Sequence, residues 1–564
     1  MGCVTLSIRS FIGKAICGLF GIIQGGRDMR KVVILSVLLT VMLAPLVPVM
    51  AQGGEEFTCP NQGGTMVVAY GADPRTLSGL YANDGNSLFV VTFMAEPLLL
   101  GGENWGDKIE PALAESWDIS EDGLEYTFHL RQGVKWHDGE PFTAEDVLFT
   151  YQATLLESNA IDWRSNLMQG DQPMQFEVVD DYTFKVKLNE PDATVLTALA
   201  IPIVPKHAFS GLEMVDAPYN TNPIATGPFK FVEWKTGESI TLEANKDYWR
   251  GAPCLDRIVV RFIEGASNIA NAILAGEVDF ARVDGADLTP FQNNPDFVLQ
   301  TAPRDLMRYV GFNVRSPIYS DPAVRRALAV GLDRQAIIDI AAGGFGTLAD
   351  SLFNKAVFMY EEGRNKQYPY DPELAKQMLA EAGWTDTDGD GILDKDGTPM
   401  TMRLVYMGSW SLMQAIAPVV YDNWRALGVD VQLTPLDEAK AYEEIYDNVS
   451  ENKPYDAMLG GWGLFGPEPD HYRNYLASPT GFFAYNNEEV QALFEQGRKV
   501  TDPQERYELY AQIDRLLWED LPMIPLYQAI GAWVYRSDLN IDAAELNGTF
   551  LTGLKYPGRV YFEK

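Results

Sequence analysis

Positive charge, cysteine and histidine are all scarce in this chain of 564 residues. There are 44 lysines and arginines against 78 aspartates and glutamates, which gives a net charge of −34. A nucleic-acid-binding protein usually carries a basic face, so this balance argues against that class and predicts no nucleic-acid partner. The four cysteines and four histidines stand singly and form no C-x-x-C or H-E-x-x-H motif. Zinc clusters and dithiol redox centres of the usual spacing are therefore excluded.

Sequence signals for enzymatic chemistry are missing as well. The chain has no glycine-rich phosphate loop and no G-x-S-x-G turn, which many phosphoryl- and acyl-transfer enzymes require. It also has no internal repeat, low-complexity tract or long Ser/Gly tether. Its domains must then be joined by short crossings, and such an architecture can hinge.

The N-terminal region has the pattern of an export signal. Residues 29–31 (MRK) are a basic start, residues 32–49 are mostly apolar, and residues 49–51 (VMA) are a usable cleavage site before Gln52. We interpret residues 29–51 as a Sec signal peptide, since two prolines and the cleavage site disfavour the alternative, a membrane anchor. Residues 1–28 are interpreted as an extension from a start codon assigned too early. Export would permit a Cys59–Cys254 disulfide; two buried thiols are the alternative.

Local patterns predict a mixed α/β chain. Strands are expected at 64–70, 125–130 and 178–188, where residues are β-rich or alternate between polar and apolar. Helices are expected after Thr143, over 323–340, over 371–382 and over 502–520. Each of these begins with a Thr or Asp cap, and three have proline at the first helical position.

An ordered set of motifs resembles one known family. The longest is residues 114–147 (AESWDISEDGLEYTFHLRQGVKWHDGEPFTAEDV), which is similar to the signature of the family-five extracellular solute-binding proteins. These are the dipeptide, oligopeptide and nickel receptors of ABC importers. Further motifs follow in the expected order, at 226–230 (TGPFK), 245–251 (NKDYWRG), 275–279 (AGEVD), 312–313 (FN), 321–334 and 460–462 (GGW).

The resemblance implies an α/β, two-lobed Venus flytrap of the type II, cluster C periplasmic-binding-protein class, with an extra β-rich subdomain. Hinge crossings would lie near residues 302–303 and 526–527. The implied domains are lobe I at 52–90, 224–303 and 530–564, the extra subdomain at 91–223, and lobe II at 304–529.

The resemblance also implies a function without catalysis. A monomer outside the cytoplasm, in the periplasm or on the cell surface, would close around a peptide or similar small polar solute and deliver it to an ABC permease in the membrane. No cofactor would be required. The alternatives are a secreted carbohydrate-active enzyme with paired carboxylates, and an oligosaccharide-binding receptor or sensor on the same cleft.

Candidate ligand residues come from the resemblance. In related peptide receptors, a Gly-Trp pair is followed three residues later by an aspartate that binds the peptide ammonium. Here Gly461, Trp462 and Gly463 are followed by Phe465, so recognition of a peptide N-terminus would need a substitute, Glu468 or Asp470. The other candidates, each with a structural alternative, are Ser409, Trp410, Tyr70, Asp73 and Phe93.

A separate acidic loop has the spacing of a calcium site. Asp386, Asp388, Asp390 and Asp394 occupy loop positions 1, 3, 5 and 9, Ile392 would offer its carbonyl at position 7, and Gly391 stands at position 6. The bidentate glutamate expected at position 12 is replaced by Gly397. The loop therefore predicts a weak structural Ca²⁺ site, and a hydrated acidic turn is the alternative.

Overall fold

The computed structural model describes residues 58–101, 109–209, 211–215, 217–355, 357–445, 453–463, 468–541, 554 and 556–563. The predicted extension and signal peptide, residues 1–51, lie outside these. Among the described residues, no helix combines the length and apolar character needed to cross a bilayer.

One large mixed sheet runs through the molecule. Its strand order is β10-β11-β12-β1-β13-β21-β14-β20-β18-β19, with β15 paired to β21. The strands are β1 (Thr65–Tyr70), β10 (Phe229–Lys235), β11 (Ser239–Ala244), β12 (Arg257–Phe262), β13 (Phe280–Asp284), β14 (Phe297–Phe312), β15 (Gly346–Leu348), β18 (Thr401–Met407), β19 (Asp430–Leu436), β20 (Ala457–Gly463) and β21 (Met523–Arg536).

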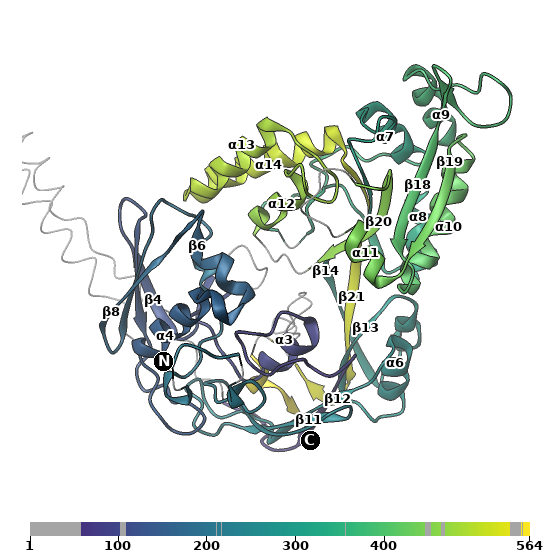
Figure 1. Cartoon of the computed structure of the whole chain (residues 1–564). Coiled ribbons are helices and arrows are strands. Elements are labelled where there is room, and N and C mark those ends of the chain that lie inside the picture. The colour runs from purple at the N-terminus through teal and green to yellow at the C-terminus, as the bar shows by residue number, and fades with distance from the viewer. Residues whose placement is uncertain are drawn as a thin grey trace, which may run out of the picture. The chain divides into compact units, whose positions relative to one another are not determined.

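Two long strands, β14 and β21, divide this sheet into two halves (Figure 1). They pair antiparallel from Phe297 opposite Arg536 to Gly311 opposite Met523, with irregular register near Pro303 and Arg308. We call the strands from β10 to β13 the first half and β20, β18 and β19 the second half. The chain crosses between the halves along these two strands, which contain residues 302–303 and 526–527, where the resemblance places the hinge; the hinge itself stays a prediction.

A side domain is formed by the four-stranded sheet β4-β5-β9-β8 and helix α4 (Figure 1). Its core is an apolar cluster drawn from residues between 80 and 219, separate from the clusters of the two halves. The strands are β4 (Ala114–Ile119), β5 (Glu125–Leu130), β8 (Gln175–Asp180) and β9 (Thr183–Lys187); two short pairs are β2 (Leu99–Gly101) with β3 (Ile109–Pro111), and β6 (Met168–Gln169) with β7 (Gln172–Pro173).

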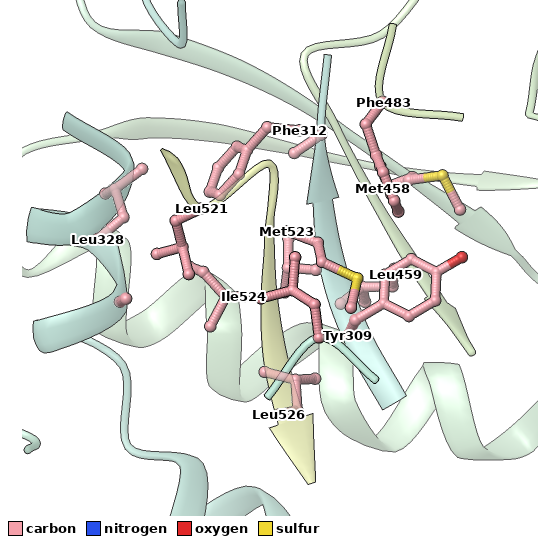
Figure 2. Close-up of a cluster of buried hydrophobic side chains, with 14 of the residues drawn as sticks. Tyr309, Phe312, Leu328, Met458, Leu459, Phe483, Leu521, Met523, Ile524 and Leu526 are labelled. Carbon is pink, nitrogen blue, oxygen red and sulfur yellow. The ribbon is translucent and has the colours of Figure 1, made fainter. Parts of the chain in front are cut away.

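Helices cover the sheets, and the second half holds the largest core. Figure 2 shows its centre, where Tyr309 and Phe312 of β14 pack with Met458 and Leu459 of β20 and with Leu328, Phe483, Leu521, Met523, Ile524 and Leu526. The helices are α3 (Gly85–Val91), α4 (Ala144–Leu155), α5 (Val195–Ala198), α6 (Ala266–Leu274), α7 (Pro322–Val330), α8 (Arg334–Ala341), α9 (Pro372–Glu381), α10 (Ser411–Arg425), α11 (Glu438–Glu444), α12 (Arg473–Leu476), α13 (Glu488–Lys499) and α14 (Pro503–Asp520).

Most of the local predictions are confirmed. Strands β1 and β5 lie where the patterns placed them, and α4, α9 and α14 begin at their predicted caps. At α4 the capping box is complete, because the Asp146 carboxylate accepts the Thr143 backbone N–H at 2.9 Å. These elements form from local hydrogen bonds that the sequence specifies directly.

Two predictions are wrong in the same way: a single strand and a single helix were expected, and each is two elements joined by a short turn. Residues 178–188 contain the end of β8 and the whole of β9, with a turn in which Asp180 accepts the backbone N–H of Tyr182 at 2.9 Å. The helix expected over 323–340 ends at Val330, and α8 starts anew with Asp333 as its cap, accepting the N–H of Ala336. The apolar spacing continued across both turns and concealed them.

The predicted cysteine pair is joined in the structure. Cys59 and Cys254 form a disulfide with Cα atoms 5.4 Å apart across a sequence separation of 195 residues. It ties the segment before β1 to the loop before β12, the two neighbouring strands of the first half.

We expect reduction by dithiothreitol to lower the free energy of unfolding by about 2–5 kcal/mol. Without the cross-link the unfolded chain gains conformational entropy, and the gain is large for a loop of this length. Denaturant melts with and without reductant measure the change. The Cys59→Ser/Cys254→Ser double variant is the control and should not respond. A wild-type protein equally insensitive to reductant would show that the bridge does not form.

Candidate functional site

The carboxyl ends of parallel strands from both halves point toward the middle of the two long strands. In the first half, β1, β12 and β13 are parallel, and the end of β13 at Asp284 lies opposite Gly531 of β21. In the second half, β18, β19 and β20 are parallel, and the end of β20 at Gly463 lies opposite Leu306 of β14. The two edges therefore face the same crossing. Open α/β sheets bind ligands beyond the carboxyl ends of their strands.

On the first-half edge, three predicted ligand residues differ in their surroundings. Tyr70 ends β1, is half-buried and stacks on Phe89 with ring centroids 4.3 Å apart. Asp73 accepts hydrogen bonds from Trp234 Nε1 at 2.9 Å and from the Gly237 N–H, and Phe93 is 1% exposed in the core. Tyr70 stays a predicted ligand residue, while these contacts favour the structural alternatives for Asp73 and Phe93.

On the second-half edge, the loop after β18 is exposed. Ser409 is exposed, and Trp410 is 38% exposed and occupies the cap position of α10. An exposed indole offers a flat apolar face to a ligand. Gly461, Trp462 and Gly463 form the last residues of β20, and Phe465 lies outside the described residues. Ser409, Trp410 and residues 461–463 lie at one sheet edge, and these residues and Phe465 stay predicted ligand residues.

The sequence analysis missed Arg308, which lies directly opposite Gly461 at the crossing. Its side chain fills the space beside this glycine, so that a Cβ on residue 461 would overlap the guanidinium. Burial lowers the pKa of Arg308, and the Tyr527 hydroxyl and the Asp284 carboxylate oppose that effect. The Arg308 Nε has no hydrogen-bond partner among the described residues. Only strand pairing reveals this contact, because the two positions are far apart in the chain.

The two acids proposed as substitutes for the missing aspartate have different roles. Glu468 is 4% exposed and forms an ion pair with Arg506 at 2.5 Å, and it also caps the Asp470 backbone N–H. Asp470, in the turn Pro469–Tyr472 that follows β20, has a buried Oδ1 without a hydrogen-bond partner in the part of the chain that the structure describes. Burial raises the pKa of Asp470, and the neighbouring Glu468 carboxylate raises it further. Glu468 is therefore committed to a cation of the protein. Asp470 has Arg473, Arg498 and His471 nearby, which act to lower its pKa, but its Oδ1 accepts no hydrogen bond from the described residues.

The acidic loop between α9 and the short strand β16 (Asp394–Lys395) gathers part of its predicted ligand set. Carboxylate oxygens of Asp386, Asp388 and Asp394 lie within 4.8 Å of one another on the surface. Asp390 is not part of this group and accepts the Ile392 N–H at 2.7 Å. The three grouped aspartates have the oxygen donors that a hard cation prefers.

Comparisons with known proteins agree with one another. Residues 108–484 match the family model described as bacterial extracellular solute-binding proteins, family 5 Middle. The oligopeptide-binding protein AppA of Bacillus subtilis is 31% identical over 485 residues, covering 83% of this chain and 87% of its own length. Its crystal structure with a nonapeptide superposes with a TM-score of 0.73 at 29% identity, over 90% of this chain and all of that one. The ABC transporter substrate-binding protein CtaP of Listeria monocytogenes gives a TM-score of 0.80 at 28% identity, over 89% of this chain and all of that one.

We expect Gly461→Ala to destabilise the protein by about 1–3 kcal/mol, the usual range for overpacking, because the new methyl displaces Arg308. Denaturant melts measure the loss. Gly71→Ala, at the facing edge, is the matched control because no atom lies within 4 Å of its added Cβ. Equal stability losses in the two variants would contradict the close approach of Arg308.

Proposed function

The chain belongs to the bacterial extracellular solute-binding proteins of family 5, and we propose that it captures a peptide with a free N-terminus between the two facing sheet edges. Proteins of this family are the non-enzymatic substrate-binding components of ABC importers for peptides or related solutes. The fold is the mixed α/β fold of the cluster C receptors. Family membership sets aside the alternative of a carbohydrate-active enzyme.

The choice of a peptide rests first on the relatives. AppA is named an oligopeptide-binding protein, and its superposed structure holds a nonapeptide. The edges of this chain offer aromatic side chains, Tyr70 and Trp410, at the ends of β1 and β18. Among the described residues, strand β20 pairs only with β14 after Met458. Its other side there can offer backbone groups to an extended chain, which can bind by adding a strand.

The observation that carries the free N-terminus is the buried Oδ1 of Asp470, which has no hydrogen-bond partner among the described residues. A carboxylate held in this way gains from a cation, and an α-ammonium can donate a charge-assisted hydrogen bond to it. Phe465 has no charge to offer, and Glu468 is already paired with Arg506. We therefore assign to Asp470 the role that an aspartate at position 465 has in the resembling peptide receptors.

Capture would proceed by rotation about β14 and β21. In this proposal lobe I is 52–90, 224–303 and 530–564, the extra subdomain is 91–223, and lobe II is 304–529. The separate apolar clusters of the side domain and the two halves support rigid bodies of this kind. The exported monomer, released from its signal peptide at residues 29–51, would present the closed form to a membrane permease in the periplasm or at the cell surface.

We further infer that calcium is the ion suited to the loop of Asp386, Asp388 and Asp394, because the donors are all oxygens and the loop spacing is that of calcium loops. The Ile392 carbonyl would complete the set. The role is structural, since the loop only connects α9 to β16.

We expect Asp470→Asn to weaken binding of a free nonapeptide about 10- to 100-fold, the effect of losing one charged hydrogen-bonding partner. Calorimetry against the N-acetylated peptide should show no such difference between the variant and the wild type. Affinity of the wild type should fall as the pH drops through the raised pKa of Asp470, because the protonated acid no longer attracts the ammonium.

Two controls make this result specific. Glu489→Gln removes an exposed carboxylate of α13 and should bind like the wild type, and Asp470→Asn should lose the acidic part of the pH profile. Equal binding of free and acetylated peptides by the wild type would rule out recognition of the N-terminus.

We expect millimolar calcium to raise the melting temperature relative to a chelator, by mass action worth about 2.7 kcal/mol at a hundredfold excess over the dissociation constant. Asp388→Asn should abolish the shift, while Asp390→Asn, outside the carboxylate group, should retain most of it. No shift in the wild type at millimolar calcium would leave the loop as a hydrated turn.

A further inference from the structure

A second connection joins the side domain to the second half, away from the long strands. The C-terminal end of α13 reaches the segment 189–194 of the side domain, near β6 (Figure 1). Arg498 Nε and Nη2 donate to Asp192 Oδ2 at 3.0 and 2.9 Å, and the Arg498 carbonyl accepts the Ala193 N–H at 2.8 Å. Lys499 and Glu190 add an ion pair at 3.0 Å.

The Asp192 side chain is held ready for this contact by its own domain. Its Oδ1 accepts both the backbone N–H and the hydroxyl of Thr194, at 2.9 and 2.7 Å, which leaves Oδ2 for the arginine. The segment is also anchored to β6, because Gln169 donates to the Glu190 carbonyl at 2.8 Å. An acceptor fixed in this way loses little entropy when its partner arrives.

The two ion pairs differ in strength. The Asp192 side chain is 2% exposed and that of Arg498 is 26% exposed, whereas Glu190 and Lys499 are both half-exposed. Burial acts to lower the pKa of Arg498, but the Asp192 carboxylate raises it above its usual value. Water screens an exposed pair much more than a buried one, so the Asp192–Arg498 pair is the stronger of the two.

The Asp192–Arg498 pair links two parts of the molecule at a point away from the long strands. The side domain and α13 are 306 residues apart in the chain at this contact, and the crossings β14 and β21 lie elsewhere in the molecule (Figure 1). An opening rotation about those crossings would move α13 away from segment 189–194. A pair with hydrogen bonds near 3 Å cannot span even a small opening.

We propose that Asp192 and Arg498 form a clasp that exists only when the two edges are closed, and that it sets how slowly a bound solute leaves. The proposal rests on the proposed function, since it concerns release from the same site. Arg498 also lies near Asp470, whose carboxylate favours its charge. Asp192 is therefore the cleaner residue to change, because it belongs to the opposite domain.

The first test is the release rate of a nonapeptide with a free N-terminus, measured by stopped flow. Asp192→Asn should release it about tenfold faster with an unchanged association rate, as expected when one partner of a buried charge pair is lost. Glu190→Gln, in the same segment but half-exposed, should change the rate little. An unchanged release rate in Asp192→Asn would overturn the clasp.

A second test does not depend on the ligand. Ala193 and Arg498 share a backbone hydrogen bond, so Ala193→Cys/Arg498→Cys should form a disulfide on mild oxidation, detected by peptide mapping. The oxidised protein should neither admit nor release the nonapeptide until it is reduced. Absence of the cross-link would mean that the contact does not form. A wild type that binds no nonapeptide would refute the proposed ligand, while formation of the cross-link would still support the closed contact.

Discussion

The antiparallel pairing of β14 with β21 is the constraint on which the rest of the structure depends. Their register runs from Phe297 opposite Arg536 to Gly311 opposite Met523, so one pair of strands serves both halves of the sheet. The neighbouring strands take their direction from these two. Because β13 pairs with β21 and β20 pairs with β14, the carboxyl ends in both halves face the same crossing. The candidate site follows from this arrangement.

The acidic groups at this site differ in whether their oxygens have partners within the protein. Glu468 and Arg506 neutralise each other in a buried pair, which fixes the turn after β20. Asp470, in that turn, retains a buried oxygen that accepts no hydrogen bond from any described residue. Such an imbalance costs stability in the free protein. It is the kind of feature expected where a ligand supplies a hydrogen-bond donor. Exposed acids elsewhere on the surface give no such indication, because water already solvates them.

Local signals were sufficient for much of the fold. The Thr143 capping box and the Asp-Pro starts before α9 and α14 specify helices through bonds made within one turn. The turns at Asp180 and Asp333 were missed, since the apolar spacing on either side continues in phase and hides the break. Family resemblance added the two-lobed architecture and the positions of Trp410 and Gly461. It could not reveal Arg308, which meets Gly461 only through strand pairing.

The sequence by itself determined the class of protein, its main local elements and the absence of the expected aspartate at residue 465, because composition, caps and ordered motifs are properties of short segments. Only the tertiary structure distinguished the surroundings of Glu468 and Asp470, since Glu468 pairs with Arg506, which is 38 residues away in the chain. It also brought Asp192 to Arg498 across 306 residues. Contacts of this kind arise from the packing of whole domains, and no local pattern encodes which distant side chain will neutralise a given charge.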